Sequence, residues 1–266
     1  MKCFLFFLFI SLPALAGLPV DLVVDIDLTI AALVPDKPNA DLLGGPSENL
    51  ITVRDERYRV FQGVRDRFAN WVREKQAAGL VRLHFFSGGT EVRNESLLRA
   101  IKLQDGSSLW DLCEGRSHGR SALTPTGLGP PHHIRDRFKK DLRTINPDIS
   151  DVILVDDIKE FAPDSQRDHV LWIGEDFPFP DRFHDGPIPS LVSSQVKERE
   201  MKKYDWIVDQ LDRALNERLK SGRSMASIIP EITRHQSLTP FTSTLPTAIP
   251  ACDPLPVLDR LLGRGL

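Results

Sequence analysis

Short apolar runs alternate with segments of helical periodicity through the first two thirds of this chain. Each run has the length of a strand, and each intervening segment repeats apolar residues at the spacing of one helix face. Strand, helix and strand in this order build a parallel sheet with helices on both faces. The sequence therefore predicts a three-layer α/β fold. The expected strands are 18–24, 80–86, 152–155 and 169–173, and the expected helices are 64–76, 97–103 and 134–145.

Two segments rich in turn-forming residues interrupt this pattern. Residues 31–60 hold several Pro and Gly residues and then an alternating stretch, which predicts a loop and a small hairpin over 51–60. Residues 105–133 are rich in Gly, Ser, Pro and His, which predicts a loop. Neither segment is long enough to form a core of its own. We therefore expect residues 17–189 to form one sheet domain without a large cap domain.

The C-terminal part of the chain differs in composition from the sheet domain. Residues 190–222 carry one apolar face over many helical turns and end at Gly222, so they predict a long amphipathic helix. Residues 223–266 are rich in proline. This tail is expected either to lie over the body of the protein or to be mobile.

The N-terminus has the pattern of a secretory signal. Lys2 precedes a short apolar run, and Ala14-Leu15-Ala16 matches a cleavage site, so residues 1–16 are expected to be removed. The alternatives are a buried strand or an uncleaved anchor. No later apolar run is long enough to cross a membrane. The mature chain is thus expected to be secreted or periplasmic, where Cys113 and Cys252 could form a disulfide.

The charge balance limits the class of partner. The chain has 34 basic and 37 acidic residues, which gives a formal net charge of −3. Gathering long nucleic acids through their phosphates needs a clear basic excess. The composition argues against bulk nucleic-acid binding and leaves room for a local basic pocket.

Two carboxylates stand at the end of the first expected strand. Asp25 and Asp27 follow the apolar residues 22–24. Carboxylates at the end of a buried strand cost free energy unless a cation or a reaction uses them. The spacing alone is weak evidence, because Asp-x-Asp pairs also occur in calcium-binding loops and in plain turns.

Other expected strand ends carry groups that complement this pair. Ser87 and Gly88 follow the second strand, where a hydroxyl and exposed backbone N–H groups suit a phosphate oxygen. Lys140 precedes the next apolar turn, and Asp156 and Asp157 close the strand at 152–155. Taken singly, these residues are a turn serine, a surface lysine and a helix cap. Because ligands bind beyond the carboxyl ends of parallel strands, we expect them to converge on one crevice.

The order and wording of these segments resemble the four motifs of the haloacid dehalogenase superfamily. Within it, the chain is most similar to Asp-x-Asp-x-Thr phosphatases of the NLI-interacting-factor-like type, related to the small phosphatases of the RNA polymerase II C-terminal domain. The resemblance covers about residues 18–175 and implies a Rossmann-like sheet. The matching segments are Val24-Asp25-Ile26-Asp27-Leu28-Thr29, Phe86-Ser87-Gly88, Lys140-Asp141-Leu142 and Leu154-Val155-Asp156-Asp157.

The chain departs from those nuclear enzymes in three respects. It has the signal pattern at residues 1–16, a Gly- and His-rich insert, and Asp157 where the family commonly has Asn. Their polymerase substrate is therefore not carried over.

The resemblance implies catalytic roles for the residues at the strand ends. Asp25 would be the nucleophile that forms an aspartyl phosphate. Asp27 would protonate the leaving oxygen and then deprotonate water, with a pKa raised by the neighbouring carboxylates. Ser87, Gly88 and Lys140 would bind the phosphoryl oxygens, and Lys140 would also offset the charge near Asp25.

The resemblance also implies a magnesium site. Asp25, Asp156 and Asp157 would hold Mg²⁺ together with the backbone carbonyl of Asp27, since this cation prefers oxygen ligands. Thr29 would fix the loop and take no part in the reaction.

The expected function is that of an exported Mg²⁺-dependent phosphomonoester hydrolase. Its short inserts suggest an open crevice, so its phosphorylated substrate can be macromolecular. Two alternatives remain: a non-catalytic secreted module that binds a metal or phosphate, and a phosphotransferase that uses an acceptor other than water.

Several other residues invite a functional interpretation that we consider weaker. The loop histidines lack Cys or acidic partners at zinc spacing, the loop arginines are candidates for a substrate-facing basic patch, and the tryptophans are expected to pack. These residues are His118, His132 and His133; Arg116, Arg120 and Arg135; and Trp71, Trp110, Trp172 and Trp206.

Overall fold

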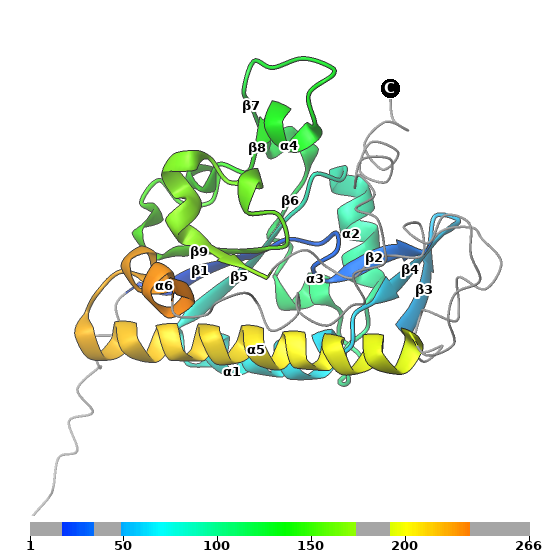
Figure 1. Ribbon diagram of the computed structural model, residues 1–266. Coiled ribbons are helices and arrows are strands. Elements are labelled where there is room, and N and C mark those ends of the chain that lie inside the picture. Colours follow the sequence, from blue (N-terminus) through cyan, green and yellow to red (C-terminus); the bar gives the residue numbers. More distant parts are fainter. Residues whose placement is uncertain (1–17, 35–48, 174–191, 235–266) are drawn as a thin grey trace, which may run out of the picture.

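A five-stranded sheet in the order β10-β9-β1-β5-β6 organises the protein (Figure 1). The computed structural model describes residues 18–34, 49–173 and 192–234. All strand pairs of this sheet are parallel. The predicted α/β class with a parallel sheet is confirmed. The strands are β1 (Val20–Val24), β5 (Val81–Phe86), β6 (Ser117–His118), β9 (Val152–Asp156) and β10 (Val170–Trp172).

Apolar side chains of the sheet fill a core on each of its faces. Along β1, Leu22 and Val24 belong to the larger core, and Val23 between them belongs to the smaller core on the opposite face. Side chains alternate along a strand, so Asp21 and Asp25 share the face of Val23. The sheet is thus the middle of three layers, and its smaller core lies on the side to which Asp25 points.

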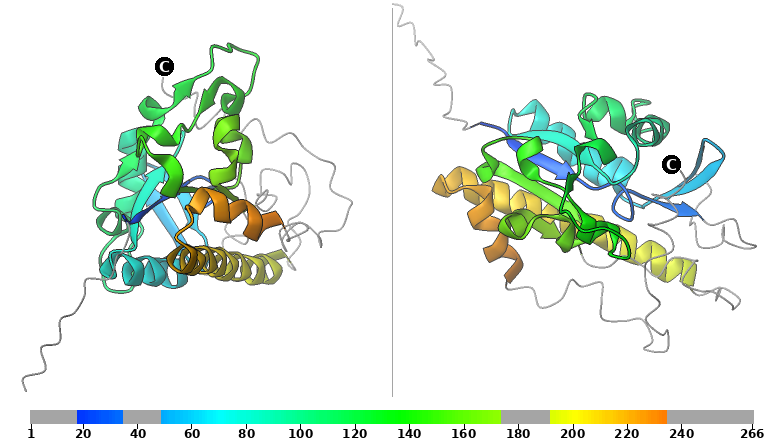
Figure 2. Two further views of the ribbon diagram at one scale, coloured as in Figure 1. Left: turned by 90° about the vertical axis from the view of Figure 1, so that its left-hand side faces the viewer. Right: turned by 90° about the horizontal axis from the view of Figure 1, so that it is seen from above.

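Helices cover the face with the larger core. In Figure 1, α5 (Val192–Ser221) runs below the sheet beside α1 (Ala69–Ala77), which continues a π-helical turn, η3 (Val64–Phe68). The helix α6 (Met225–Arg234) follows α5 and buries Met225, Ile228 and Ile229 in the same core. Figure 2 shows α5 and α6 on one side of the sheet and residues 120–145 on the other.

Helices occur where the sequence predicted them at 190–222 and near 97–103. The amphipathic helix predicted at 190–222 is α5. The tail lies over the body as far as Arg234, because α6 packs there, and residues 235–266 lie outside the described residues. The helix predicted at 97–103 is α2 (Glu91–Ala100), which begins earlier because Thr90 caps it: the Thr90 side chain accepts a hydrogen bond from the Arg93 amide at 3.4 Å.

The helix predicted at 134–145 is wrong in conformation. The segment forms one helical turn, α4 (Ile134–Arg137), then β8 (Phe138–Lys139), and a 3₁₀ turn, η5 (Leu142–Thr144). Its apolar residues at helical spacing do share one core, since Leu142 is buried there and Ile134, Phe138 and Ile145 pack against it. The inference that one side of this segment is buried is therefore correct. Its strand β8 pairs with β7 (Thr124–Pro125).

The two inserts contain more structure than the sequence indicated. A three-stranded antiparallel sheet in the order β2-β4-β3 includes the predicted hairpin. Its members are β2 (Ala31–Val34), β3 (Leu50–Val53) and β4 (Glu56–Val60). Residues 105–133 were predicted as loop, yet they include α3 (Leu109–Leu112), β6 and β7.

Short 3₁₀ turns complete the face with the smaller core. They are η4 (Arg120–Ala122), η6 (Ile149–Asp151), η7 (Lys159–Phe161) and η8 (Asp164–His169). None of the described helices is both long and apolar enough to cross a membrane. The predicted signal peptide, residues 1–16, lies outside the described residues, as does Cys252; Cys113 is buried and free.

Candidate active site

The predicted site residues meet at the carboxyl ends of the central strands. Asp25 follows β1 directly, Ser87 follows β5, and Asp156 is the last residue of β9. The Asp25 amide donates to the carbonyl of Val155 at 3.0 Å, which continues the β1–β9 pairing to the edge of the sheet. The fold therefore brings these side chains together as the strand-end argument predicted.

One lysine joins two buried carboxylates at this edge. The Nζ atom of Lys140 lies 2.5 Å from Oδ1 of Asp25 and 2.7 Å from Oδ2 of Asp156. Lys140 and Asp156 are each 1% exposed, and Asp25 is 4% exposed. The backbone holds the lysine in place, because its amide donates to the Phe161 carbonyl at 2.8 Å. Charges buried this deeply require partners at such short distances.

The same carboxylates could hold a metal ion. Asp25, Asp156 and Asp157 each offer an oxygen atom, and these atoms lie within 4.8 Å of one another. All three are buried, and Asp25 and Asp156 share the Lys140 ammonium. Hard oxygen donors of this kind fit Mg²⁺. The fourth ligand that the resemblance implies, the backbone carbonyl of Asp27, stays a prediction, because this group consists of side-chain oxygens.

The pKa of Asp25 reflects its burial first and its charged neighbours second. Burial raises the pKa of Asp25 to about 7, the nearby Asp156 and Asp27 add to the increase, and Lys140 opposes it. A carboxylate in that state gains from any additional cation beside it.

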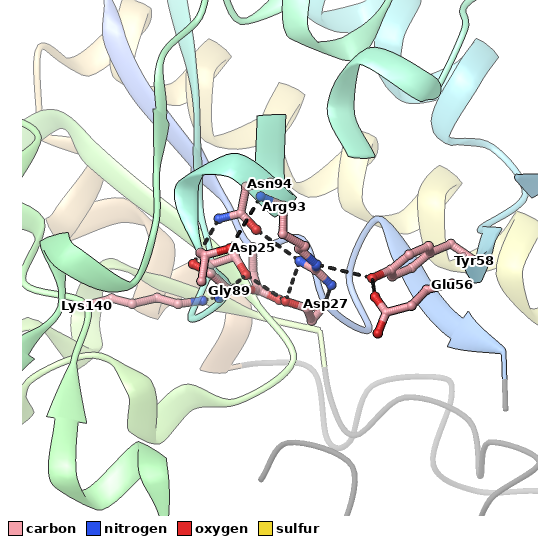
Figure 3. A network of polar contacts seen from close by, with 10 residues as sticks. Asp25, Asp27, Glu56, Tyr58, Gly89, Arg93, Asn94 and Lys140 are labelled. Carbon is pink, nitrogen blue, oxygen red and sulfur yellow. Dashed lines mark hydrogen bonds and ion pairs between the residues drawn. The ribbon is translucent and has the colours of Figure 1, made fainter. Parts of the chain in front are cut away.

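Asp27 has a different environment from the one that the sequence suggested. Both of its oxygens bind the Arg93 guanidinium, which approaches closely at Oδ1 and lies 3.1 Å from Oδ2, and the Ser87 hydroxyl donates to Oδ2 at 2.6 Å (Figure 3). Burial alone would raise the pKa of Asp27, but the charge and hydrogen bonds of Arg93 and the bond from Ser87 lower it overall. The expected increase in pKa is therefore wrong for the free protein.

A loop of backbone amides lies beside Ser87. The Gly89 amide donates to Ser87 Oγ at 3.0 Å, and the Ser87 amide donates to the His118 carbonyl at 3.1 Å, so β6 holds this loop. Gly88 lies between them, and its carbonyl accepts a bond from Arg120 Nε at 3.4 Å. Ser87 and Gly88 thus lie where a phosphate-binding loop was predicted.

The chain turns sharply after the two aspartates. Leu28 adopts a left-handed conformation with φ of 63°, and Thr29 is fully buried. Two side chains of helix α5 bind backbone carbonyls of this turn. Lys203 Nζ donates to the Leu28 carbonyl at 3.0 Å, and the Tyr204 hydroxyl donates a short hydrogen bond to the Thr29 carbonyl. Among the described residues, Thr29 Oγ1 has no hydrogen-bond partner. The turn is fixed through its backbone, and the Thr29 side chain contributes packing.

Most of the other candidate residues lie apart from the carboxylates. His118 packs against His84 and Phe86, whereas no contact joins it to His132 or His133 among the interactions of the described residues. Arg116 binds the Leu83 carbonyl and Glu114. Among the three loop arginines, Arg120 contacts the Ser87–Gly89 loop through the Gly88 carbonyl. Arg135 has no hydrogen bond to this loop among the described residues.

The tryptophans pack as predicted, and one of them also contacts the backbone of Asp157. Trp71 is buried in the larger core, and Trp110 and Trp206 are partly buried side chains that pack against this core. Trp172 packs against the smaller core and donates from Nε1 to the Asp157 carbonyl at 2.9 Å. This bond helps to position the backbone of Asp157.

Sequence reasoning missed Arg93 and Tyr58. Arg93 was not assigned a role because the helix that carries it was expected to begin at residue 97. The pattern Thr90-Glu91-Val92-Arg93 directly after two glycines could have located a helix start, and thus a cation in its first turn. Tyr58 lies on the insert, and nothing in the local sequence indicates that it reaches the site.

The chain has a similar solved structure, at low sequence identity. No family model and no curated protein matches the chain. A solved structure of an arginine-to-alanine variant of the fission yeast RNA polymerase II CTD phosphatase Fcp1, bound to beryllium fluoride, is similar at a TM-score of 0.45. The match has 14% sequence identity and covers 80% of this chain and 70% of that chain.

Proposed function

We propose that this protein is an exported, Mg²⁺-dependent phosphomonoester hydrolase that acts through an aspartyl phosphate. The observation that carries the proposal is the buried group of Asp25, Asp156 and Asp157, of which Asp25 and Asp156 bind Lys140. Three buried carboxylates with oxygen atoms within 4.8 Å of one another offer the hard oxygen ligands that a divalent cation prefers. A divalent cation and a phosphoryl group would use this arrangement.

The first half of the reaction forms a bond between Asp25 and phosphorus. A carboxylate oxygen of Asp25 attacks, and the bond from phosphorus to the leaving oxygen breaks. Lys140, 2.5 Å from Oδ1, orients this carboxylate and offsets the charge on the phosphoryl group. Bound Mg²⁺, held by the three carboxylates and the Asp27 carbonyl, would supply further positive charge for the phosphoryl oxygens.

Asp27 handles the proton in both halves. In the first half, Asp27 gives a proton to the leaving oxygen. In the second half, water attacks phosphorus and Asp27 takes a proton from that water. The bond between phosphorus and Asp25 then breaks, which releases phosphate and restores the Asp25 carboxylate. In the free protein Asp27 is held ionised by Arg93 and Ser87. The ionised carboxylate can act as a base directly. To act as an acid, Asp27 must first bind a proton, which requires Arg93 and Ser87 to bind the phosphoryl group of the substrate in place of Asp27.

The location and the substrate class rest on the sequence. The pattern in residues 1–16 supports export, and the small inserts support a substrate whose phosphate lies on a macromolecule. Export would be tested in a secreting host by N-terminal sequencing: a mature chain that begins at Gly17 is expected, and retention of Met1 would contradict it.

The experiment for the activity measures phosphate release by the purified protein from phosphopeptides, nucleotides and sugar phosphates. We expect release with Mg²⁺ and none after EDTA, and Asp157→Ala should raise the Mg²⁺ concentration needed. Asp164→Ala is the matched control, since this carboxylate is 83% exposed and bound to Arg167. It should leave the requirement unchanged.

Three results would decide against the proposal. Full activity in EDTA would refute the requirement for a metal ion. Phosphate binding without turnover would support the binding module. Transfer of phosphate to an added alcohol in preference to water would support the phosphotransferase.

A further inference from the structure

We infer that Arg93 is a further phosphate-binding residue of this site, and that the Asp27 carboxylate occupies it in the free protein. The inference rests on the proposed function and adds a residue to its substrate-binding set. Its starting point is the network in Figure 3, which leads from Asp27 through Arg93 to Tyr58 and Glu56 on the small antiparallel sheet.

Arg93 and Ser87 donate to one and the same oxygen atom. Ser87 Oγ lies 2.6 Å from Asp27 Oδ2, and Arg93 Nη1 lies 3.1 Å from it. Two donors that share an acceptor are close enough to bind one tetrahedral anion together. The planar guanidinium binds both oxygens of a carboxylate with the same pair of parallel bonds that it uses for phosphate. Asp27 therefore accepts the bonds that a phosphoryl group would take.

Arg93 also lies directly against the glycine loop. A Cβ atom added to Gly89 would come within 3.0 Å of Arg93 Nη1 and 2.7 Å of Asn94 Oδ1. The guanidinium thus occupies the space that a side chain at position 89 would fill, next to the amide that binds Ser87. A glycine at this position lets the positive charge approach the predicted phosphate loop.

The small sheet holds the arginine from its far side. Arg93 Nε donates to the Tyr58 hydroxyl at 3.4 Å, and that hydroxyl donates to Glu56 Oε2 at 2.6 Å. The guanidinium also lies 5.3 Å from the centre of the Tyr58 ring. Tyr58 is 1% exposed, so this support is rigid. The Arg93 side chain, itself 13% exposed, is positioned before any ligand arrives.

A phosphate dianion competes with Asp27 for these donors. It carries more charge than a carboxylate and can accept from Ser87 and Arg93 at once. When it binds, Asp27 loses two of its partners. The proposal therefore predicts opposite effects on phosphate affinity when Arg93 and Asp27 are altered.

The test is the binding of inorganic phosphate to the full chain with Mg²⁺, measured by isothermal titration calorimetry. Arg93→Gln should weaken binding by about tenfold or more, as expected for a lost charge-assisted hydrogen bond, and Arg93→Lys should restore part of it. Asp27→Asn should strengthen binding, because it removes the competing charge. Adding Arg93→Gln to Asp27→Asn should abolish that gain.

Arg99→Gln is the matched control. Arg99 lies on the same helix, binds Glu95 at 2.8 Å and lies 4.7 Å from the centre of the Trp110 ring. It should leave the phosphate affinity unchanged. Equal loss in this variant would mean that α2 as a whole was perturbed and would overturn the assignment.

Other outcomes separate this inference from the proposed function. A folded Arg93→Gln protein with wild-type phosphate affinity would overturn the inference while leaving hydrolysis intact. If Arg93→Gln does not fold, Asp27→Asn decides: unchanged or weaker binding of phosphate overturns the competition. Phosphate binding that follows the expected pattern without any hydrolysis would instead refute the enzyme and leave Arg93 as a ligand.

Discussion

Replacing Asp25 by asparagine should stabilise the metal-free protein at pH 8, although it removes the proposed nucleophile. Asp25 is 4% exposed and shares Lys140 with Asp156. Burial, followed by the charges of Asp156 and Asp27, raises the pKa of Asp25 to about 7 against the effect of Lys140. The ionised form is therefore unfavourable in the folded chain.

The sign and size of the effect follow from proton linkage. Between about pH 4 and pH 7 the folded protein keeps a proton on Asp25 that the unfolded chain has released, so stability falls as the pH rises through this window. Each pH unit between the two pKa values corresponds to about 1.4 kcal/mol. Across this window the loss approaches about 4 kcal/mol, an upper limit because water and side-chain relaxation ease the buried charge.

The assay is urea denaturation in EDTA, followed by tryptophan fluorescence from pH 4 to pH 8. Near pH 4 the neutral carboxyl group of Asp25 and the amide that replaces it in Asp25→Asn are similar, so the two proteins should have similar free energies of unfolding. The variant should become progressively more stable than the wild type towards pH 8. Contributions of other carboxylates largely cancel in the difference.

Two comparisons make the result decisive. Mg²⁺ should remove most of the wild-type loss, because the cation stabilises the ionised carboxylate, and it should have a smaller effect on Asp25→Asn. Asp164→Asn, altered at an exposed carboxylate, should follow the wild type at every pH. A difference between Asp25→Asn and wild type that does not change with pH would refute the account of the buried charges.

Three further perturbations test the support of the site. Lys140→Met should destabilise the metal-free protein at pH 8 by about 3–5 kcal/mol in urea denaturation, because two buried carboxylates lose their shared ammonium; a change below about 1 kcal/mol would contradict this. Tyr204→Phe should lower the free energy of unfolding in urea by about 1–3 kcal/mol, since the Thr29 carbonyl loses a buried donor. The same variant should lower kcat more than it changes KM. Gly63→Ala should lower the thermal midpoint, because its φ is 91° and a Cβ atom would lie 2.7 Å from Cβ of Tyr204; an unchanged midpoint would contradict the contact.

The sheet and its strand-end residues could be predicted because their signals are local. An apolar run followed by a carboxylate is visible in the sequence, and parallel strands place such ends at one edge. Asp25, Ser87 and Asp156 were located in this way. Lys140 was also identified, although its segment was predicted to be helical. Apolar residues at a spacing of four show which side is buried, and here short strands and single turns bury the same side.

Contacts between distant segments could not be predicted from the sequence. Tyr204 lies 175 positions after Thr29, and Tyr58 lies 35 positions before Arg93. Neither has a local pattern that indicates its partner. The error in the pKa of Asp27 has the same origin, because it came from counting neighbouring carboxylates without the arginine that the fold brings to them.

The two proposed reacting carboxylates depend on different parts of the fold. Asp25 is held by the core itself, through the pairing of β1 with β9 and through Lys140. Asp27 is held by Ser87 at the end of β5 and also by elements outside the five-stranded sheet. Helix α5 fixes the carbonyls that follow it, and the small antiparallel sheet holds Arg93, which binds its carboxylate. We therefore expect changes in the insert or in the docking of α5 to affect the proposed proton-transfer residue Asp27 more than the proposed nucleophile Asp25.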